Sequence, residues 1–455
     1  MVKCKIDRLA WFRKKDVDVE AIKKRLTISV AQFSGPAKVF RMYEEKEKLI
    51  GVPRMWAVKN YKLDVIDRTT FIKMKWPKMV WPEGYDWWPG QKKSVQSIAR
   101  NLKDGKFGTL LEAACGTGKT FMSIAAAARM KTPMLVMVHK NDLAEQWRET
   151  AQKFFPGVRI GHVQQDKWDF QNCHIVTAMA QTMYKKRFSI PKDFWNNFGI
   201  TAFDEGHRYS AKTFEQVLAM SKTRHRLACS ATWRRKDGLT FVWEWHIGSI
   251  DQVAKGVKLT GEYVNVPWNT RIEDSMYRIR GRVNQPRMLT MIGDNKPYNN
   301  WIAAQCINAA KVGRRYLIVS DRIDQLLDVR SRILKKGDGF SVGLYSSSAE
   351  YTNPEKKRRR KVKKDELTFA KNCDIILATY QMMNEGTDIP ALDTLLLATP
   401  KSDIEQIVGR IQRHQEGKKA LLVVNPFFTT TYQTRLGMKR AEALENLGFT
   451  ERITE

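Results

Sequence analysis

Short apolar runs alternate with amphipathic stretches from about residue 108 to the end of the chain. Runs rich in Val, Ile, Leu and Ala are typical of strands buried on both faces of a parallel sheet, and the stretches between them predict helices. We therefore predict repeated βαβ units in two successive lobes. The expected strands are 109–113, 134–139, 174–178, 200–205 and 226–230 in the first lobe, and 316–320, 341–345, 375–379, 394–399 and 420–425 in the second.

A polar stretch at 270–298, interrupted by Pro286 and Pro297, separates the two series. Prolines in a polar stretch predict a loop, so we place a connector there between lobes at 86–269 and 299–455. Residues 1–85 match neither series, because strand-like pieces at 26–30 and 55–58 mix with charged, helix-like segments. We expect this part to be a small α+β accessory domain that binds DNA.

The composition favours a polyanionic partner. The chain has 455 residues with 43% hydrophobic content, enough for two or three cores, and 79 basic against 48 acidic residues give a net charge of +31. Nucleic acid is the favoured partner, and a merely soluble basic protein is the alternative. Six scattered cysteines without a C-x-x-C pair argue against disulfides and zinc, and no apolar run of about 18 residues indicates a membrane span. We expect a soluble, cytoplasmic protein, or one of the host cytoplasm if a phage encodes it.

Candidate phosphate-binding residues follow the first predicted strand. The segment Glu112-Ala-Ala-Cys-Gly-Thr-Gly-Lys-Thr120 matches G-x-x-x-x-G-K-[ST] except that alanine stands at 113. Backbone N–H groups around Gly116, Thr117 and Gly118 can turn toward phosphate oxygens, Lys119 can reach the β and γ phosphates, and Thr120 can hold Mg²⁺. An alanine at 113 is compatible if that position does not need a positive φ. A chance glycine-rich turn is the alternative.

Two candidate catalytic carboxylates end the fourth predicted strand. Asp204 and Glu205 begin the segment Asp-Glu-Gly-His, and a parallel sheet brings that strand end toward the phosphate loop. Asp204 is expected to assist in holding Mg²⁺, and Glu205 to orient and deprotonate the attacking water. Two surface carboxylates at a strand end are the alternative interpretation.

These motifs together resemble those of the superfamily 2 helicases. Gln91 in Trp-Pro-Gly-Gln is similar to the adenine-reading glutamine of that family, and Leu143, Gln146 and Trp147 resemble its DNA-side motif. His139-Lys140 replaces the usual Pro-Thr of the DNA-side motif. The resemblance implies two RecA-like lobes and the cofactors ATP and Mg²⁺.

The next family motifs concern coupling. Ser230 and Thr232 in Ser-Ala-Thr match the motif that links hydrolysis to lobe movement. Arg235 lies in the following segment, 233–238, which is similar to that of the branch containing UvsW, XPB, RecG and type I restriction motors, and the resemblance implies coupling or DNA contact there.

Residues of the second lobe complete the resemblance. Gly386 and Asp388 in Glu-Gly-Thr-Asp-Ile-Pro are similar to the interlobe coupling motif. Gln406, Arg410 and Arg413 match Q-x-x-G-R-x-x-R, and a helix places the two arginines on one face. The guanidinium groups suit the charge that develops on a transferring phosphoryl group, so the site is expected to draw on both lobes. For two arginines alone, a solvated basic face would be the better interpretation.

The resemblance implies an ATP-dependent DNA helicase or translocase of 3′-to-5′ type. The segments Arg41-Met-Tyr-Glu and Ile50-Gly-Val-Pro-Arg54 are similar to phage UvsW-like helicases, with a T-odd phage member expected, which remodel forked and four-way DNA. An RNA helicase and a basic DNA-binding scaffold with a degenerate nucleotide site are the alternatives.

Two further features have more than one interpretation. The basic run at 356–364 is expected to form a charged helix, either solvated or in contact with phosphates. Tryptophans 76, 81, 87 and 88 can stack on bases or can pack against the first lobe, which is the commoner use.

Overall fold

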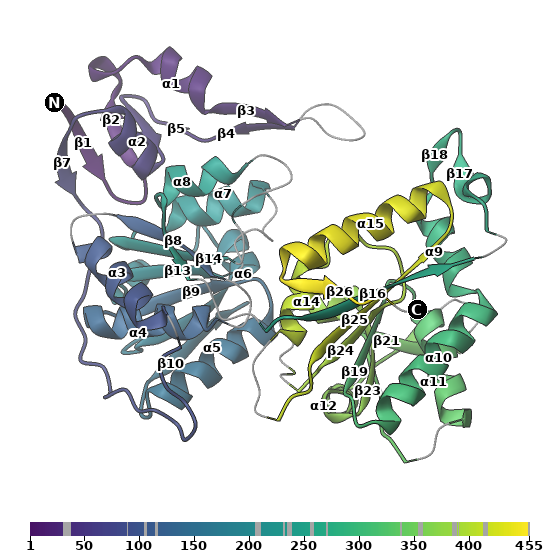
Figure 1. Ribbon diagram of the computed structural model, residues 1–455. Coiled ribbons are helices and arrows are strands. Elements are labelled where there is room, and N and C mark those ends of the chain that lie inside the picture. Colours follow the sequence, from purple (N-terminus) through teal and green to yellow (C-terminus); the bar gives the residue numbers. More distant parts are fainter. Residues whose placement is uncertain are drawn as a thin grey trace. The chain divides into compact units, whose positions relative to one another are not determined.

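The structure is a computed structural model that divides into two compact units, Met1–Val257 and Lys258–Glu455. Each unit is described by itself, and Figure 1 labels their elements. The described residues are 1–30, 38–88, 90–103, 107–113, 117–204, 211–230, 233, 239–254, 259–269, 272–336, 339–353, 358–384, 389, 391–412 and 417–453. Across these ranges, no helix is long and apolar enough to cross a membrane.

Residues 1–67 form a small mixed sheet with helices at the start of the first unit. The strands lie in the order β5-β6-β2-β1-β7, and β1 and β7 pair in parallel. The elements are β1 (Val2–Ile6), β2 (Ala10–Arg13), α1 (Val19–Leu26), β5 (Glu44–Glu45), β6 (Leu49–Val52), α2 (Arg54–Asn60), β7 (Leu63–Asp67) and the hairpin of β3 (Thr27–Val30) and β4 (Lys38–Arg41). This arrangement confirms the predicted α+β character.

One strand predicted in this region is wrong, because residues 55–58 lie within helix α2. The helix follows Pro53, whose fixed φ suits a helix start. Trp56 and Ala57 are adjacent and both buried, whereas Val58 is 41% exposed. Two successive buried side chains are incompatible with the alternation of a half-buried strand.

Two buried arginines join this small sheet to the rest of the first unit. The guanidinium of Arg54 donates to the carbonyl oxygens of Thr223 (2.8 Å), Ser221 (3.1 Å) and Asp7. Arg226 donates to the carbonyls of Ser221 (2.7 Å) and Arg8 (2.6 Å). Burial lowers the pKa of Arg54 to about 9, so its guanidinium remains protonated at neutral pH and is stabilised by these carbonyl dipoles.

The main sheet of the first unit has eight strands within the described ranges, in the order β11-β10-β12-β9-β13-β14-β8-β15. All neighbours pair in parallel except β10 and β11. The strands are β8 (Gly108–Ala113), β9 (Met134–Val138), β10 (Ile160–Gln164), β11 (Lys167–Asp169), β12 (Ile175–Met179), β13 (Ile200–Asp204), β14 (His225–Ser230) and β15 (Ile250–Ala254). The five predicted strands are thus confirmed, and apolar side chains from both faces form the core.

Helices surround this sheet (Figure 1). They are α3 (Gln91–Lys103), α4 (Lys119–Met130), α5 (Asn141–Phe154), α6 (Ala180–Lys185), α7 (Ala211–Met220) and α8 (Thr240–His246). The tryptophan-rich segment before α3 packs on them, because Trp81 contacts Phe121 of α4 and Phe154 of α5 at ring distances of 5.5 and 5.7 Å. Packing against the first lobe is therefore the role that the geometry supports for this segment.

The second unit contains a seven-stranded parallel sheet within its described part, in the order β20-β23-β19-β24-β25-β16-β26. The strands are β16 (Gly261–Trp268), β19 (Tyr316–Ser320), β20 (Val342–Tyr345), β23 (Ile375–Thr379), β24 (Thr394–Leu397), β25 (Leu421–Phe428) and β26 (Phe449–Glu451). The helices are α9 (Gln285–Gly293), α10 (Lys296–Lys311), α11 (Ile323–Lys336), α12 (Lys364–Asn372), α13 (Tyr380–Asn384), α14 (Glu405–Ile411) and α15 (Thr431–Asn446). The five strands predicted for this lobe are confirmed.

The predicted connector at 270–298 and the lobe boundaries beside it differ from the structure. The units divide at Val257/Lys258, and β16 pairs along its length with β25, so 261–268 belongs to the second sheet. The stretch 272–298 carries the small hairpin of β17 (Arg278–Ile279) and β18 (Arg282–Val283), then α9 and the start of α10. Pro286 and Pro297 sit in the first turns of these helices, where proline starts a helix rather than ending one.

The helix predicted for the basic run at 356–364 is also wrong. In its described residues, β22 (Arg358–Lys361) pairs antiparallel with β21 (Ser348–Asn353), and α12 begins only at Lys364. Arg360 forms ion pairs with Glu350 and Glu366, both at 2.8 Å, and Arg359 with Asp324 at 2.5 Å. Carboxylates from neighbouring elements stabilise the extended conformation of the run.

Candidate functional site

The described end of the phosphate-loop segment, Thr117–Lys119, is a turn that leads into α4. Gly118 caps α4 with a φ of +81°, a conformation that favours glycine, and Lys119 is the first residue of the helix. A Cβ at Gly118 would lie 2.6 Å from Nε2 of Gln91, so a side chain there would displace the glutamine. Thr117 is buried and Thr120 is half-buried. Backbone N–H groups at the start of α4 suit an anion, because a helix N-terminus carries a partial positive charge.

Gln91 holds this turn from the side. Its Nε2 donates to the carbonyl of Thr117 at 2.8 Å, and its Oε1 accepts from the backbone N–H of Trp88 at 3.1 Å. The side chain is 7% exposed at the start of α3. The sequence predicted a glutamine that reads adenine, and the structure places it directly against the phosphate-loop turn.

Asp204 lies at the same edge of the sheet as this turn. It ends β13, which is separated from β8 by β14, so the two strands lie about 10 Å apart. Ser230 ends β14 and is fully buried, in register with Glu112 of β8. The strand that ends at Asp204 and the strand that precedes the phosphate-loop turn therefore end at the same edge of the sheet.

Trp147 orients the Asp204 carboxylate. The indole N–H of Trp147, on α5, donates to Oδ2 of Asp204 at 2.8 Å, and both side chains are buried, with exposures of 0% and 5%. The family resemblance placed Trp147 in a DNA-side motif, but a fully buried indole offers no surface to nucleic acid. Sequence reasoning missed this contact, because no pattern links a helix residue with a strand end 57 positions later.

Contacts of Ser123 connect the start of α4 with β14. The hydroxyl of Ser123 donates to the carbonyl of Lys119 at 2.8 Å and lies 3.1 Å from Sγ of Cys229. Cys229 pairs in register with Asp204 and precedes Ser230. The first turn of α4 is thereby connected to the strand that carries the Ser-Ala-Thr motif.

Two predicted site residues of the second unit lie on helix α14. Gln406 and Arg410 are four positions apart and share a helix face, and Arg410 is only 6% exposed. The remaining predicted site residues lie outside the described residues: Gly116, Glu205, Thr232, Arg235, Gly386, Asp388 and Arg413.

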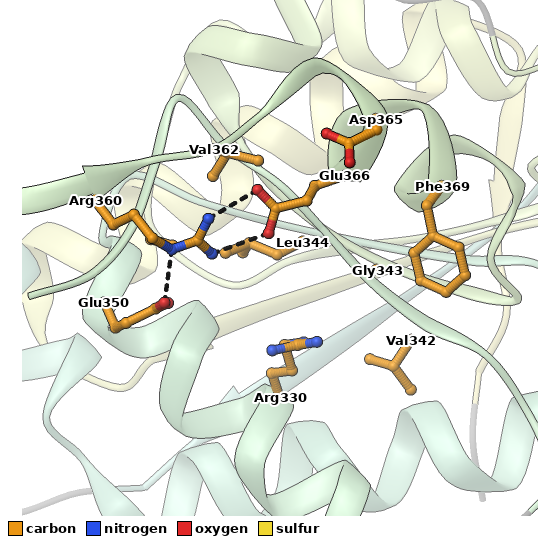
Figure 2. Close-up of a pocket in the computed structure, with 11 residues that line it drawn as sticks. Arg330, Val342, Gly343, Leu344, Glu350, Arg360, Val362, Asp365, Glu366 and Phe369 are labelled. Carbon is orange, nitrogen blue, oxygen red and sulfur yellow. Dashed lines mark hydrogen bonds and ion pairs between the residues drawn. The ribbon is translucent and has the colours of Figure 1, made fainter.

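A separate pocket of about 360 Å³ lies in the second unit between α11, β20, the β21–β22 hairpin and α12 (Figure 2). Arg360 lies on one wall and donates to Glu366 at 2.8 and 3.0 Å. These hydrogen bonds lower the pKa of Glu366 to about 2. None of the predicted site residues lines this pocket, and Arg360 is neutralised by Glu350 and Glu366. The pocket is therefore distinct from the candidate site of the first unit.

Comparisons with known proteins agree with the architecture. Residues 85–235 match the family described as "Type III restriction enzyme, res subunit". The chain is 25% identical to a putative ATP-dependent RNA helicase of Acanthamoeba polyphaga mimivirus, over 93% of this chain and 81% of the relative. It is 26% identical to a probable helicase of Escherichia phage T5, over 68% of this chain and 65% of the relative.

A solved structure shares the fold. The ATP-dependent Type ISP restriction-modification enzyme LlaBIII bound to DNA aligns with 82% of this chain, with a TM-score of 0.52 and 17% identity. The aligned part is 30% of that chain. This likeness and the observed sheets confirm the predicted α/β class, with two sheets that are parallel apart from the β10–β11 pair and a small mixed sheet at the start.

Proposed function

We propose that the chain is a helicase of superfamily 2, an ATP-dependent DNA motor that remodels forks and four-way junctions in replication, recombination or repair. The family match over residues 85–235 and the relatives named as helicases support this proposal. The observation that carries the proposal is the sheet edge of the first unit. There, the Thr117–Lys119 turn is clamped by Gln91, and Asp204 is oriented by Trp147.

The nucleotide site uses groups suited to a triphosphate and its metal ion. The Lys119 ammonium and the N–H groups of Gly116, Thr117 and Gly118 bind phosphate oxygens, and Gln91 recognises adenine. The Thr120 hydroxyl and the Asp204 carboxylate are hard oxygen donors of the kind that Mg²⁺ prefers. The Trp147 hydrogen bond fixes the orientation of that carboxylate, as outer partners of metal-site residues commonly do.

Hydrolysis and coupling use residues assigned from the family resemblance. Glu205 accepts a proton from the attacking water. Arg410 and Arg413, with Gln406, stabilise the charge on the transferring phosphoryl group, and an arginine in this role typically contributes about 10³- to 10⁵-fold in rate. The coupling residues, which transmit hydrolysis to DNA movement, are Ser230, Thr232, Arg235, Gly386 and Asp388.

The net charge of +31 supports a nucleic-acid substrate. Segments 41–44 and 50–54 resemble UvsW-like helicases and favour branched DNA. An RNA helicase is the second candidate, because the mimivirus relative is named as one. A DNA-binding scaffold is the third, and measurable ATP turnover distinguishes a motor from it.

The test uses a fork, a four-way junction and a linear duplex of equal length, each with ATP and Mg²⁺. We expect ATP-dependent fork regression and junction migration, with neither reaction in Lys119→Ala. If the protein unwinds RNA duplexes that carry single-stranded tails and leaves forks and junctions unchanged, the RNA helicase would be favoured. Equal results with and without ATP would contradict a motor.

A further inference from the structure

An aromatic residue stands out from the first unit at the end of α6. Phe188 is 90% exposed, and it lies in the segment 184–192, which we call the α6 tip. The guanidinium carbon of Arg187 lies 4.5 Å from the ring centroid of Phe188 and 4.7 Å from that of Tyr184. Arg187 therefore sits between two rings, and the face of Phe188 away from it is open to solvent.

Local hydrogen bonds give the α6 tip a defined shape. The backbone N–H of Ser189 donates to the carbonyl of Lys186 at 2.8 Å, and Arg187 donates through Nη1 to the carbonyl of Tyr184, also at 2.8 Å. From the β10–β11 hairpin, Asp166 pairs with Lys186 at 2.7 Å, and the N–H of Gln165 donates to the Thr182 hydroxyl at 3.0 Å. These hydrogen bonds and this ion pair stabilise the backbone around Phe188, whose ring is exposed to solvent.

The α6 tip is strongly cationic. The segment 184–192 contains Lys185, Lys186, Arg187 and Lys192 and no acidic residue. Lys186 is paired with Asp166, whereas Lys185 and Lys192 are exposed. An open aromatic face beside several cations matches an unpaired nucleotide, because the base can stack while the phosphates are neutralised.

The position of the α6 tip agrees with this ligand. Helix α6 follows β12 directly, and β12 lies beside β9 in the parallel sheet whose carboxyl edge also carries the turn at Lys119. Nε2 of Gln181 donates to the carbonyl of His139, just after β9, at 2.9 Å. Gln165 and Asp166, which contact Thr182 and Lys186, also follow the carboxyl end of a parallel strand, β10. A nucleic acid on Phe188 would therefore lie at the sheet edge that holds the candidate nucleotide site.

We propose that Phe188 is a stacking platform for an unpaired nucleobase and that Lys185, Arg187 and Lys192 contact the neighbouring phosphates. This inference rests on the proposed function, because it requires that the chain bind nucleic acid. Single-stranded segments expose bases at forks and junctions, so the α6 tip would contact the strand that leaves the duplex.

The experiment compares two labelled 20-nucleotide DNA strands of equal charge, one with bases and one fully abasic. Wild-type protein is expected to bind the base-bearing strand more tightly. Phe188→Ala should weaken that binding about 5- to 20-fold and leave the abasic strand unchanged, and Phe188→Trp should restore it. The double variant Lys185→Gln/Lys192→Gln should instead weaken both strands and flatten the salt dependence.

Phe369→Ala is the matched control, since Phe369 is also an exposed aromatic residue, at 60%, but lies on α12 of the second unit. It should bind both strands as wild type does. Binding of anionic phospholipid vesicles is measured in parallel. The stacking assignment would be overturned if Phe188→Ala lost equal affinity for both strands, or if it lost affinity only for the vesicles. If wild-type protein binds no nucleic acid, the proposed function fails first, so the two failures can be distinguished.

Discussion

The first strand-to-helix turn of the first sheet and its counterpart after β19 in the second are held by different side-chain contacts. After β8, Gly118 takes a positive φ at the helix start, and the Gln91 side chain holds the turn through the Thr117 carbonyl. After β19, the Thr399 hydroxyl accepts from the N–H of Asp321 and the Ser320 hydroxyl from that of Arg322, both at 2.9 Å. These hydroxyls satisfy donors that would otherwise be available to an anion.

The comparison assigns the candidate phosphate site to the turn and not to the sheet. Both units surround a parallel sheet with helices, but the second turn presents Asp321, which is paired with Lys401 at 3.4 Å, where the first presents Lys119. Function is therefore assigned from the residues of the site and not from the shared architecture.

The largest expected effect comes from removing the cation of the first turn. Lys119→Ala should abolish ATP hydrolysis, because the ammonium that neutralises the phosphates is lost, while nucleic-acid binding is retained. Arg322→Ala, at the corresponding turn of the second unit, is the control and should hydrolyse ATP as wild type does. Steady-state ATP turnover measures both, and an active Lys119→Ala variant would refute the assigned loop.

A smaller effect is expected from the tryptophan that orients Asp204. Trp147→Phe keeps most of the buried ring but removes the N–H donor at 2.8 Å. The Mg²⁺ concentration for half-maximal ATP turnover should rise about 10- to 100-fold, with a smaller change in turnover at saturating Mg²⁺.

Trp301→Phe, on α10 of the second unit, is the matched control and should leave the Mg²⁺ dependence unchanged. A fall in thermal stability of Trp147→Phe with an unchanged Mg²⁺ dependence would show that the indole only fills the core.

The smallest expected effect is a pH dependence of stability that differs between the two units. Burial, reinforced by Arg226 and Arg54, lowers the pKa of His246 well below its ordinary 6.5. Below pH 6.5 the His246 imidazole therefore binds a proton in the unfolded chain but not in the folded chain. The free energy of unfolding keeps its full value above pH 6.5 and decreases as the pH drops below it. The slope for one proton is at most about 1.4 kcal/mol per pH unit.

The second unit buries Arg440 beside Tyr298 and Tyr380 instead, and burial raises the pKa of both phenols, so neither titrates in this range. Hydrogen exchange resolved by unit, at about pH 7.5 and about pH 5.5, should show the first unit losing more protection. His246→Leu should reduce that loss, and an unchanged loss in this variant would exclude His246 as its source.

The elements that the sequence predicted well are those whose own residues determine burial. Strands such as Ile200–Asp204 and Ile375–Thr379 are mostly apolar and are buried at every position, so their pattern alone indicates a central parallel strand. In β16, only Tyr263 is fully buried, because the strand lies near the edge of the sheet. The place of β16 in this sheet depends on its pairing with β25, some 160 residues later.

The candidate site divides in the same way. Lys119 and Asp204 belong to local motifs and could be found from spacing. The Trp147 indole contact and the Arg360 ion pairs depend on side chains brought together by folding. The family resemblance therefore placed Trp147 in a DNA-side motif, and the charge pattern predicted a helix at 356–364.

We propose that ATP hydrolysis at the site containing Lys119 drives a DNA motor. ATP turnover measured on forked DNA, a four-way junction, plain duplex DNA and single-stranded RNA tests it most directly. We expect ATP turnover that branched DNA stimulates most strongly and that Lys119→Ala abolishes. No turnover, or strongest stimulation by RNA, would contradict it.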